Sequence, residues 1–151
     1  AMENVLIGAQ MQVGQPRSVW QSAHDNQAAV GLARSLLEQL GLTHLANTPV
    51  REIGYGEQRQ LEIALALALK PKILLLDEPT AGLSVAETRV VSRLINKLPA
   101  DLTLILIEHD LEFVFDIADH LTVLYHGERI ADGPAAAIRG DPVVKEVYLG
   151  D

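Results

Sequence analysis

The 151-residue chain contains no cysteine, no long apolar run and no cluster of basic residues. The absence of cysteine excludes disulfide bonds and fits a reducing compartment. The longest apolar candidate, residues 63–76, is interrupted by Lys70-Pro71-Lys72 and falls short of the roughly 18 apolar residues that a membrane span requires. The first residues do not form a signal peptide pattern, so we expect a cytoplasmic protein.

Acidic residues outnumber basic ones by 20 to 12, which gives a formal net charge of −8. A surface that binds nucleic acid needs clustered lysine and arginine to neutralise phosphates. The sequence offers no such cluster, and we therefore expect no nucleic-acid partner. Hydrophobic residues make up 48% of the chain, enough for a sizeable core.

The apolar pattern predicts a helical N-terminal part. Residues 3–9 suit a short helix, and residues 10–24 form a polar connection without periodicity. Residues 26–40 place their apolar side chains on one face of a helix. Residues 57–70 suit a second helix, which is apolar on nearly every side from residue 63 to residue 69 and is therefore expected to be buried.

Strands alternate with helices after residue 70. Residues 73–76 form a continuous apolar run, as expected for a strand of a parallel sheet that is covered on both faces, and residues 102–107 are expected to form a second buried strand. The capping box at residues 84–87 predicts a helix that continues to residue 98, and Asp110 caps a short helix that ends near Ala118.

A hairpin and two short helices are expected at the C-terminal end. The hairpin covers residues 121–131 and turns at His126-Gly127. Pro134 and Pro142 suit first-turn positions of the two helices, and Asp141 caps the second. We therefore predict an α/β fold, with a helical subdomain at residues 1–70 and the strand-containing part at residues 71–151.

Asp77 and Glu78 are the strongest sign of chemistry, because they end the apolar run 73–76. Open parallel sheets bind ligands outside the carboxyl ends of their strands. In that position Asp77 would hold Mg²⁺ through water, and Glu78 would orient and deprotonate an attacking water. An acidic α/β protein can also end a strand in Asp-Glu without catalytic purpose, so the pair alone leaves both readings open.

A glycine turn and a histidine accompany this pair. Gly54 and Gly56 precede a helix, where free backbone N–H groups and the helix dipole can attract an anion. His109 follows the strand 102–107, and adjacent strands would bring it to the same sheet edge as Glu78, where an imidazole can contact a terminal phosphate. Taken singly, each feature is more often an ordinary loop or a solvated histidine.

Taken together and in this order, the motifs resemble those of the nucleotide-binding subunit of ABC transporters. The glycine turn and its helix are similar to the family's signature motif, and Asp77-Glu78 is similar to its Walker B pair. Residues 81–84 (Ala-Gly-Leu-Ser) resemble its D-loop, and His109 resembles its switch histidine. The sequences of residues 59–64 and 147–150 resemble those of ATPases of the branched-chain amino acid importer group, which includes relatives that serve urea and other amides.

The resemblance implies a fold and a set of site residues. The fold would be part of a RecA-like P-loop ATPase core, preceded by a helical subdomain and followed by a hairpin and short helices. Glu78 and His109 would be catalytic, and Asp77 would hold Mg²⁺ through water. The residues facing the nucleotide would be Asp77, Gly54, Tyr55, Gly56, Glu57 and Ser84.

The resemblance also implies a substrate and partners. ATP with Mg²⁺ would bind between two ATPase subunits arranged head to tail, and the pair would drive a membrane permease from the inner face of the cell membrane. Three residues depart from the family pattern. Gly54 stands where the signature offers serine, Glu57 replaces glutamine, and Ser84 replaces the aspartate of the D-loop. We expect weaker stabilisation of the transition state.

The P-loop pattern Gly-x-x-x-x-Gly-Lys-Ser/Thr does not occur, because no lysine follows a glycine. Nothing in the sequence would therefore cradle the β-phosphate. We expect a C-terminal fragment that is inactive alone and supplies only the signature half of a site to another subunit. The missing strand would also leave unpaired strand edges and an uncovered apolar face, which predicts self-association.

Three other interpretations are open. A soluble ABC ATPase of DNA repair or translation would carry zinc-type cysteines, basic patches or inserted arms, and none occurs in the sequence. A truncated relative that only binds and regulates an intact partner would fit Gly54 and Glu57. A helicase or RecA-like ATPase also ends a strand in Asp-Glu, but would not place a glycine-led helix directly before it.

Overall fold

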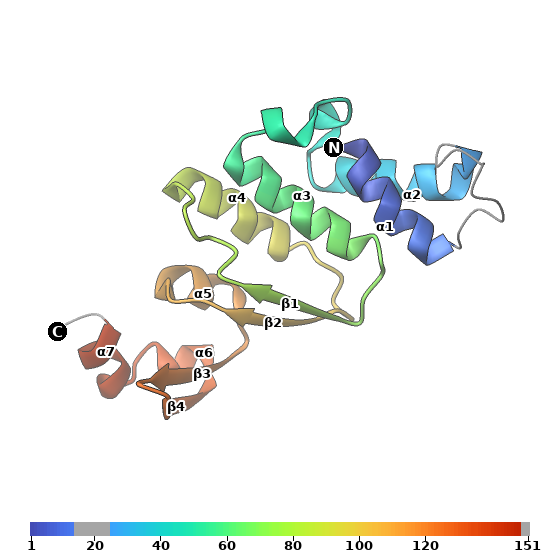
Figure 1. The fold of residues 1–151 in the computed structure, drawn as a ribbon. Coiled ribbons are helices and arrows are strands. Elements are labelled where there is room, and N and C mark those ends of the chain that lie inside the picture. Colours follow the sequence, from blue (N-terminus) through green and yellow to red (C-terminus); the bar gives the residue numbers. More distant parts are fainter. Residues whose placement is uncertain (14–24, 149–151) are drawn as a thin grey trace. The chain divides into compact units, whose positions relative to one another are not determined.

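The computed structural model describes residues 1–13 and 25–148 (Figure 1). The chain divides into two compact units, Ala1–Ile107 and Glu108–Asp151. The first unit contains helices and a two-stranded parallel sheet, and the second contains a hairpin and short helices. The predicted α/β class is confirmed, whereas the predicted boundary between residues 70 and 71 stays a prediction.

Three helices form the main core of the first unit: α1 (Met2–Val13), α2 (Gln27–Gln39) and α3 (Tyr55–Leu67). The prediction for α2 is confirmed, and its Asn26 side chain accepts a hydrogen bond from the Ala29 N–H at 3.2 Å. Among the largest fully buried side chains are Leu6 of α1 and Leu37 of α2. The apolar stripe of α2 therefore faces the core as its periodicity predicted.

Helix α1 is longer than predicted. It continues through residues 10–13, which were assigned to a polar connection. Gln and Met have high helix propensity, and residues 11–13 are exposed, so no apolar period marks the extension. The rest of the predicted connection, residues 14–24, lies outside the described residues.

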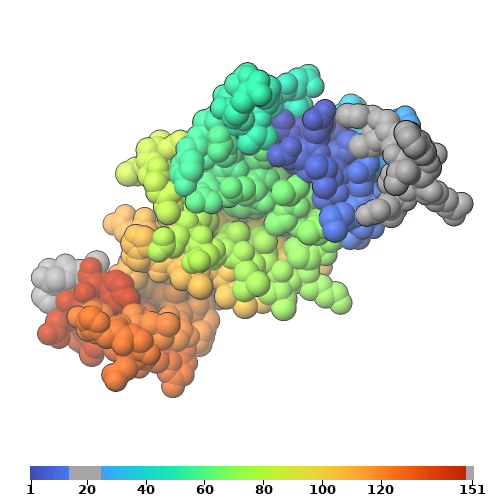
Figure 2. Space-filling view, in the orientation of Figure 1, coloured from blue at the N-terminus to red at the C-terminus, as the bar shows by residue number. Residues whose placement is uncertain are grey.

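Gly8 allows α1 to pack closely on α3. A Cβ atom at this position would lie 3.0 Å from the Ala68 Cβ and 3.0 Å from the Leu65 carbonyl oxygen. The space-filling view shows the blue surface of α1 directly against the green surface that contains α3 (Figure 2). A larger residue at position 8 would therefore separate the two helices.

Helix α3 differs from its prediction at both ends and in its burial. It begins at Tyr55 rather than residue 57 and ends at Leu67 rather than residue 70. Lys70 has a φ of +47°, a left-handed conformation that stops the helix before Pro71. Leu65 and Leu69 are 38% and 44% exposed, so the apolar stretch is not buried on every side as predicted.

The parallel sheet pairs β1 (Ile73–Asp77) with β2 (Thr103–Ile107), in a register that places Asp77 opposite Ile107. Helix α4 (Val85–Ile95) connects the strands and begins at the predicted capping box of Ser84 and Glu87. It ends before residue 98, because residues 96–98 close as turns. Figure 1 shows α3 and α4 on the same side of β1 and β2.

The opposite face of this sheet is uncovered. The apolar runs predicted strands covered on both faces, but burial alternates along β1 and β2. Four large side chains are between 48% and 71% exposed: Ile73, Leu75, Ile105 and Ile107. The prediction of cover on both faces is therefore wrong, and the face is exposed as the missing strand predicts. An apolar face of this kind favours association.

The second unit contains α5 (Leu111–Ile117), β3 (His120–Tyr125), β4 (Glu128–Pro134), α6 (Ala135–Ile138) and α7 (Pro142–Tyr148). Its small core consists of three buried residues and their neighbours: Val123, Ile138 and Val144.

The hairpin turns at His126-Gly127 as predicted. Both residues have positive φ, +49° and +83°, as a two-residue turn of type I′ requires. Asp110 caps α5 and Asp141 caps α7 as predicted. Pro134 is not in a first turn, because it ends β4 and stands at the N-cap of α6. Pro142 occupies the first position of α7 as predicted.

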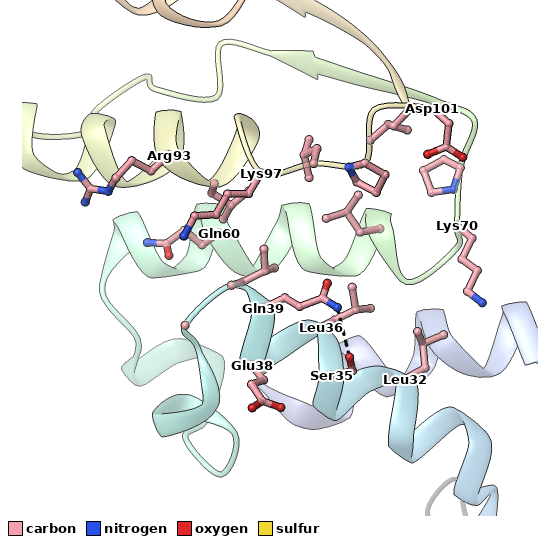
Figure 3. A pocket seen from close by; sticks show the side chains of 18 of the residues that line it. Leu32, Ser35, Leu36, Glu38, Gln39, Gln60, Lys70, Arg93, Lys97 and Asp101 are labelled. Carbon is pink, nitrogen blue, oxygen red and sulfur yellow. Dashed lines mark hydrogen bonds between the residues drawn. The ribbon is translucent and has the colours of Figure 1, made fainter.

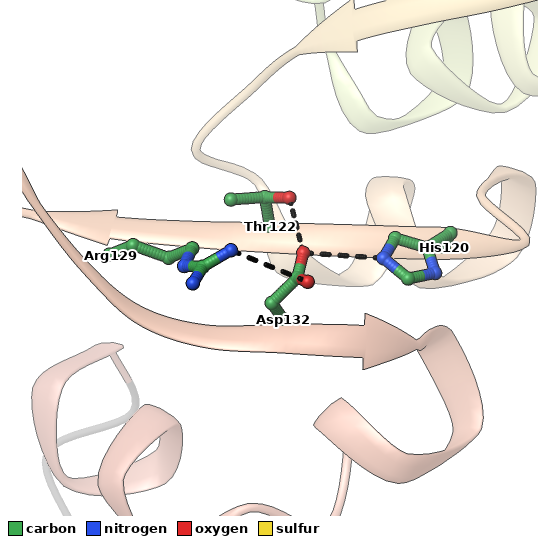
Figure 4. A network of polar contacts seen from close by, with 4 residues as sticks. All are labelled: His120, Thr122, Arg129 and Asp132. Atoms are coloured by element: carbon green, nitrogen blue, oxygen red, sulfur yellow. Dashed lines mark hydrogen bonds and ion pairs between the residues drawn. The ribbon is translucent and has the colours of Figure 1, made fainter.

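A polar network joins the two strands of the hairpin (Figure 4). The Asp132 carboxylate accepts a hydrogen bond from the Thr122 hydroxyl at 2.7 Å and lies 3.2 Å from the His120 ring nitrogen. A guanidinium nitrogen of Arg129 lies 3.6 Å from the other carboxylate oxygen of Asp132. The Thr122 hydroxyl, followed by His120, lowers the pKa of Asp132 below its usual value. These contacts hold β3 and β4 together on the exposed face of the hairpin.

Within the described residues, the helices are all too short or too polar to cross a bilayer.

Candidate functional site

The turn before α3 is held by its own side chains. Gly54 is the N-cap in an extended conformation and offers no side-chain cap. The Gln58 amide donates to the carbonyl oxygens of Val50 at 3.1 Å and Ile53 at 2.8 Å. These two bonds fix the chain ahead of the helix, so the first N–H groups of α3 have a defined direction.

The predicted D-loop lies against this helix start. Gly82 has a φ of +76°, and a Cβ atom there would lie 3.2 Å from the Tyr55 ring. A Cβ atom on Gly56 would lie 2.5 Å from a carboxylate oxygen of Glu87. Glycine is favoured at position 82 by its positive φ, and at position 56 a larger residue would displace the Glu87 side chain. The structure brings the predicted signature and D-loop motifs together within the first unit.

Glu87 connects the two motifs electrostatically. Its carboxylate accepts from the Ser84 hydroxyl at 2.5 Å and from the Ser84 N–H at 2.8 Å. These bonds lower the pKa of Glu87, the hydroxyl most strongly, and the Gly56 backbone N–H contributes as well. The Gly56 N–H, which is predicted to face an anion, therefore lies close to a carboxylate of the chain itself. The capping-box spacing revealed Glu87, but not its contact with α3.

Tyr55 and Glu57 each have a partner that the sequence did not reveal. Arg59 donates to the Tyr55 hydroxyl at 2.9 Å and to Glu62 at 2.8 Å, and the bond to Glu62 is the main cause of the raised pKa of Arg59. The His44 ring nitrogen lies 3.2 Å from a carboxylate oxygen of Glu57. A protonated imidazole at this position would offset the unfavourable charge of Glu57 beside a phosphate.

Asp77 and Glu78 occupy the carboxyl end of β1, as the sequence predicted. Glu78 has a φ of +44°, a conformation that costs free energy in residues other than glycine. Its N–H donates to the Ile107 carbonyl at 2.9 Å, which continues the contact with β2 by one residue. Lys70 and His126 adopt similar angles where a helix ends and a hairpin turns, whereas Glu78 directly follows a strand. Such strain is typical of functional positions.

His109 belongs to the second unit, and its approach to Glu78 in the first unit stays a prediction. Its side chain is 73% exposed, and its N–H donates to the Glu108 carboxylate at 3.1 Å. The Glu108 side chain is only 1% exposed, which is unusual for a carboxylate. Sequence reasoning missed Glu108, because an acidic residue after a strand gives no sign of burial.

The carboxylate of Asp77 fits a magnesium ion of the kind that nucleotides bring with them. Within the described part of the chain, no group of three or more His, Asp or Glu residues could hold a metal ion by itself. Mg²⁺ keeps several waters and is commonly held by one or two carboxylates together with substrate phosphates. One exposed carboxylate at the sheet edge is consistent with that arrangement.

The motifs agree with the comparisons with known proteins. The ABC transporter family profile matches residues 3–81, and the profile of the branched-chain amino acid ATP-binding cassette transporter matches residues 128–151. The chain is 43% identical to the high-affinity branched-chain amino acid transport ATP-binding protein BraF of Pseudomonas aeruginosa over 125 residues, which are 82% of this chain and 49% of BraF. The chain is 41% identical to LivG of Escherichia coli K12, another high-affinity branched-chain amino acid transport ATP-binding protein, again over 82% of this chain and 49% of the relative.

Solved structures give the same result. The ADP conformation of MJ1267, an ATP-binding cassette of an ABC transporter, superimposes with a TM-score of 0.78 at 30% identity, over 99% of this chain and 62% of MJ1267. The chain spans about half the length of the curated relatives that it matches. The fold is thus that of part of an ABC ATPase core with its helical subdomain, and the chain belongs to the ABC transporter family.

Proposed function

We propose that the chain is the C-terminal part of the ATP-hydrolysing subunit of an ABC importer for branched-chain amino acids. The observation that carries the proposal is the strained carboxylate Glu78 at the carboxyl edge of β1, in the unit that also joins the signature and D-loop motifs. The names of the relatives BraF and LivG support the class of transported solute.

Each site residue has a proposed role. Glu78 orients the attacking water and accepts its proton, and His109 contacts the terminal phosphate. Asp77 holds a water ligand of Mg²⁺, which when bound neutralises developing charge on the phosphates. Gly54, Tyr55, Gly56 and Glu57 face the nucleotide of a second subunit, and Ser84 reaches the same interface from the D-loop. The partners are that subunit and a permease at the inner face of the cell membrane.

The test is a complementation assay. We expect the purified chain alone to give no saturable Mg-ATP binding by titration calorimetry and no ATPase activity, because its sequence contains no P-loop. Mixing it with the N-terminal part of an ABC ATPase, chosen to contain Gly-x-x-x-x-Gly-Lys-Ser/Thr, should produce ATPase activity that neither polypeptide has alone. Micromolar Mg-ATP binding by the chain alone would contradict these roles.

One observation favours a second function, that of a non-catalytic regulator. The Glu87 carboxylate lies beside Gly56 and places a negative charge at the helix start, and Gly54 offers no hydroxyl to a phosphate. A regulator would bind an intact ATP-binding subunit but would contribute no residue to ATP hydrolysis. In the complementation assay, co-elution of the two polypeptides without ATPase activity would select this function.

The exposed sheet face predicts self-association of the isolated chain. One apolar surface contains Ile73, Leu75, Ile105 and Ile107, and the outer edges of β1 and β2 pair with no other strand of the described residues. We expect static light scattering to show a mass that rises with concentration, and Leu75→Lys to reduce this rise. Val143→Lys is the matched control, because Val143 is 49% exposed in the second unit. A wild-type chain that stays monomeric at high concentration would contradict the prediction.

A further inference from the structure

A cavity of about 940 Å³ lies in the first unit, away from the residues assigned to the nucleotide. Helix α3 lies between α2 and α4, and side chains of both neighbouring helices project across it (Figure 3). The residues 70–72 and 98–102, which lead into β1 and β2, complete the wall. None of the residues proposed to contact nucleotide lines the cavity, so nucleotide binding does not account for it.

The lining of this cavity is apolar with a cationic rim. Leucines from all three helices line it, among them Leu36, Leu67 and Leu94. Four cations also line it, Lys70, Lys72, Arg93 and Lys97, against two carboxylates, Glu38 and Asp101. The chain as a whole carries a net charge of −8, so the sign of this local charge is opposite to that of the protein.

The cations of the rim are available to a ligand. None of the four forms an ion pair with another of the residues that the structure describes. In Figure 3, Arg93 and Lys97 extend towards the end of the cavity where Gln60 lies, and Lys70 and Asp101 lie towards the other end. Arg93 in the last turn of α4 and Lys97 just beyond its end carry like charges, and an anion placed between them would relieve their repulsion.

Gln60 adds a fixed polar group at this end. It is buried, with 7% exposure, and its amide nitrogen donates to the Gly56 carbonyl oxygen at 3.3 Å. The bond holds the side chain in one orientation at the cavity wall. A mostly apolar cavity with a few positioned polar groups, within the range of roughly 300–1,000 Å³, is typical of small-molecule sites.

We propose that this cavity binds a small organic anion with an aliphatic body. The anionic head lies between Arg93 and Lys97, and the body packs on the leucines. An inorganic anion would leave the apolar lining in contact with water. The positive charge of an aliphatic cation would be repelled by the lysines and the arginine of the rim. A ligand here contacts the middle of α3, the helix whose first turn carries Gly54–Glu57, so the site is positioned to influence that turn.

The test uses octanoate and octyltrimethylammonium, which share an aliphatic chain and differ in the sign of the head group. We expect saturable octanoate binding by the full chain in an NMR titration, with shifts at Leu36, Gln60 and Leu94. Octyltrimethylammonium should neither bind there nor compete. Arg93→Glu with Lys97→Glu should raise the Kd for octanoate roughly tenfold or more, because both charge-assisted contacts become repulsive.

Arg89→Glu is the matched control, since Arg89 is exposed on the same helix and does not line the cavity. It should leave the Kd for octanoate within about twofold. Circular dichroism checks that each variant keeps its helix content, and Arg93→Gln with Lys97→Gln should weaken binding less than the charge reversal. Absence of octanoate binding would overturn the proposal. Equal binding of both probes, or shifts confined to Leu75 and Ile105 of the exposed sheet face, would overturn it as well.

Discussion

Replacing Glu78 by glutamine is expected to lower the ATPase activity of the complemented chain by at least about a hundredfold, the usual contribution of a general base. The substitution keeps the size of the side chain and its ability to accept a hydrogen bond, but removes the carboxylate that takes a proton from water. The backbone at this position is already held at a φ of +44° by its strand contact, so the amide should occupy the same place. The measurement is phosphate release at saturating Mg-ATP.

The control for this variant is Glu128→Gln. Glu128 is also exposed and begins β4, so the change removes the same charge at a position without an assigned role. It should leave phosphate release unchanged within about twofold. Binding of Mg-ATP to the complemented Glu78→Gln protein should persist, which separates loss of chemistry from loss of assembly. Full activity in Glu78→Gln would remove Glu78 from the catalytic role.

The elements of the fold were predictable where one residue pattern leaves one choice. The stripe of α2, the capping box of Ser84 and Glu87, and the His126-Gly127 turn each lie where the pattern predicted. The errors arose where burial had to be guessed. An apolar run indicates hydrophobic residues but does not indicate what packs on them, and so the exposure of Leu65 and Leu69 could not be read from the sequence.

The candidate site shows the same limit. Spacing along the chain placed Asp77 and Glu78 at the end of β1, because a strand has a direction that the sequence reveals. The contact of Glu87 with Gly56 depends on the packing of α4 against α3, which no local pattern specifies. Glu57 and His44 are separated by thirteen residues, and their approach depends on the turns between them. Pairs of this kind become visible only once the helices are packed.

Leu37→Ala should lower the free energy of unfolding of the first unit by about 2–5 kcal/mol. Leu37 is 1% exposed and lies in the cluster that joins α1, α2 and α3, where Val5 and Leu6 are equally buried. The truncation removes apolar contacts and leaves a cavity that the three surrounding helices cannot fill without separating. The free energy of unfolding of a small domain is only about 5–15 kcal/mol, so this loss is a large share of the total.

Urea unfolding followed by circular dichroism measures the change, at several protein concentrations so that association of the exposed sheet face is recognised. Leu69→Ala is the matched control, because Leu69 is 44% exposed beyond the end of α3, and the same truncation there should cost less than about 1 kcal/mol. If Leu37→Ala and Leu69→Ala cost the same, the helical cluster is not the stable core of the first unit. The hydrogen bonds of Gln58 would then hold the first turn of α3 without support from this cluster.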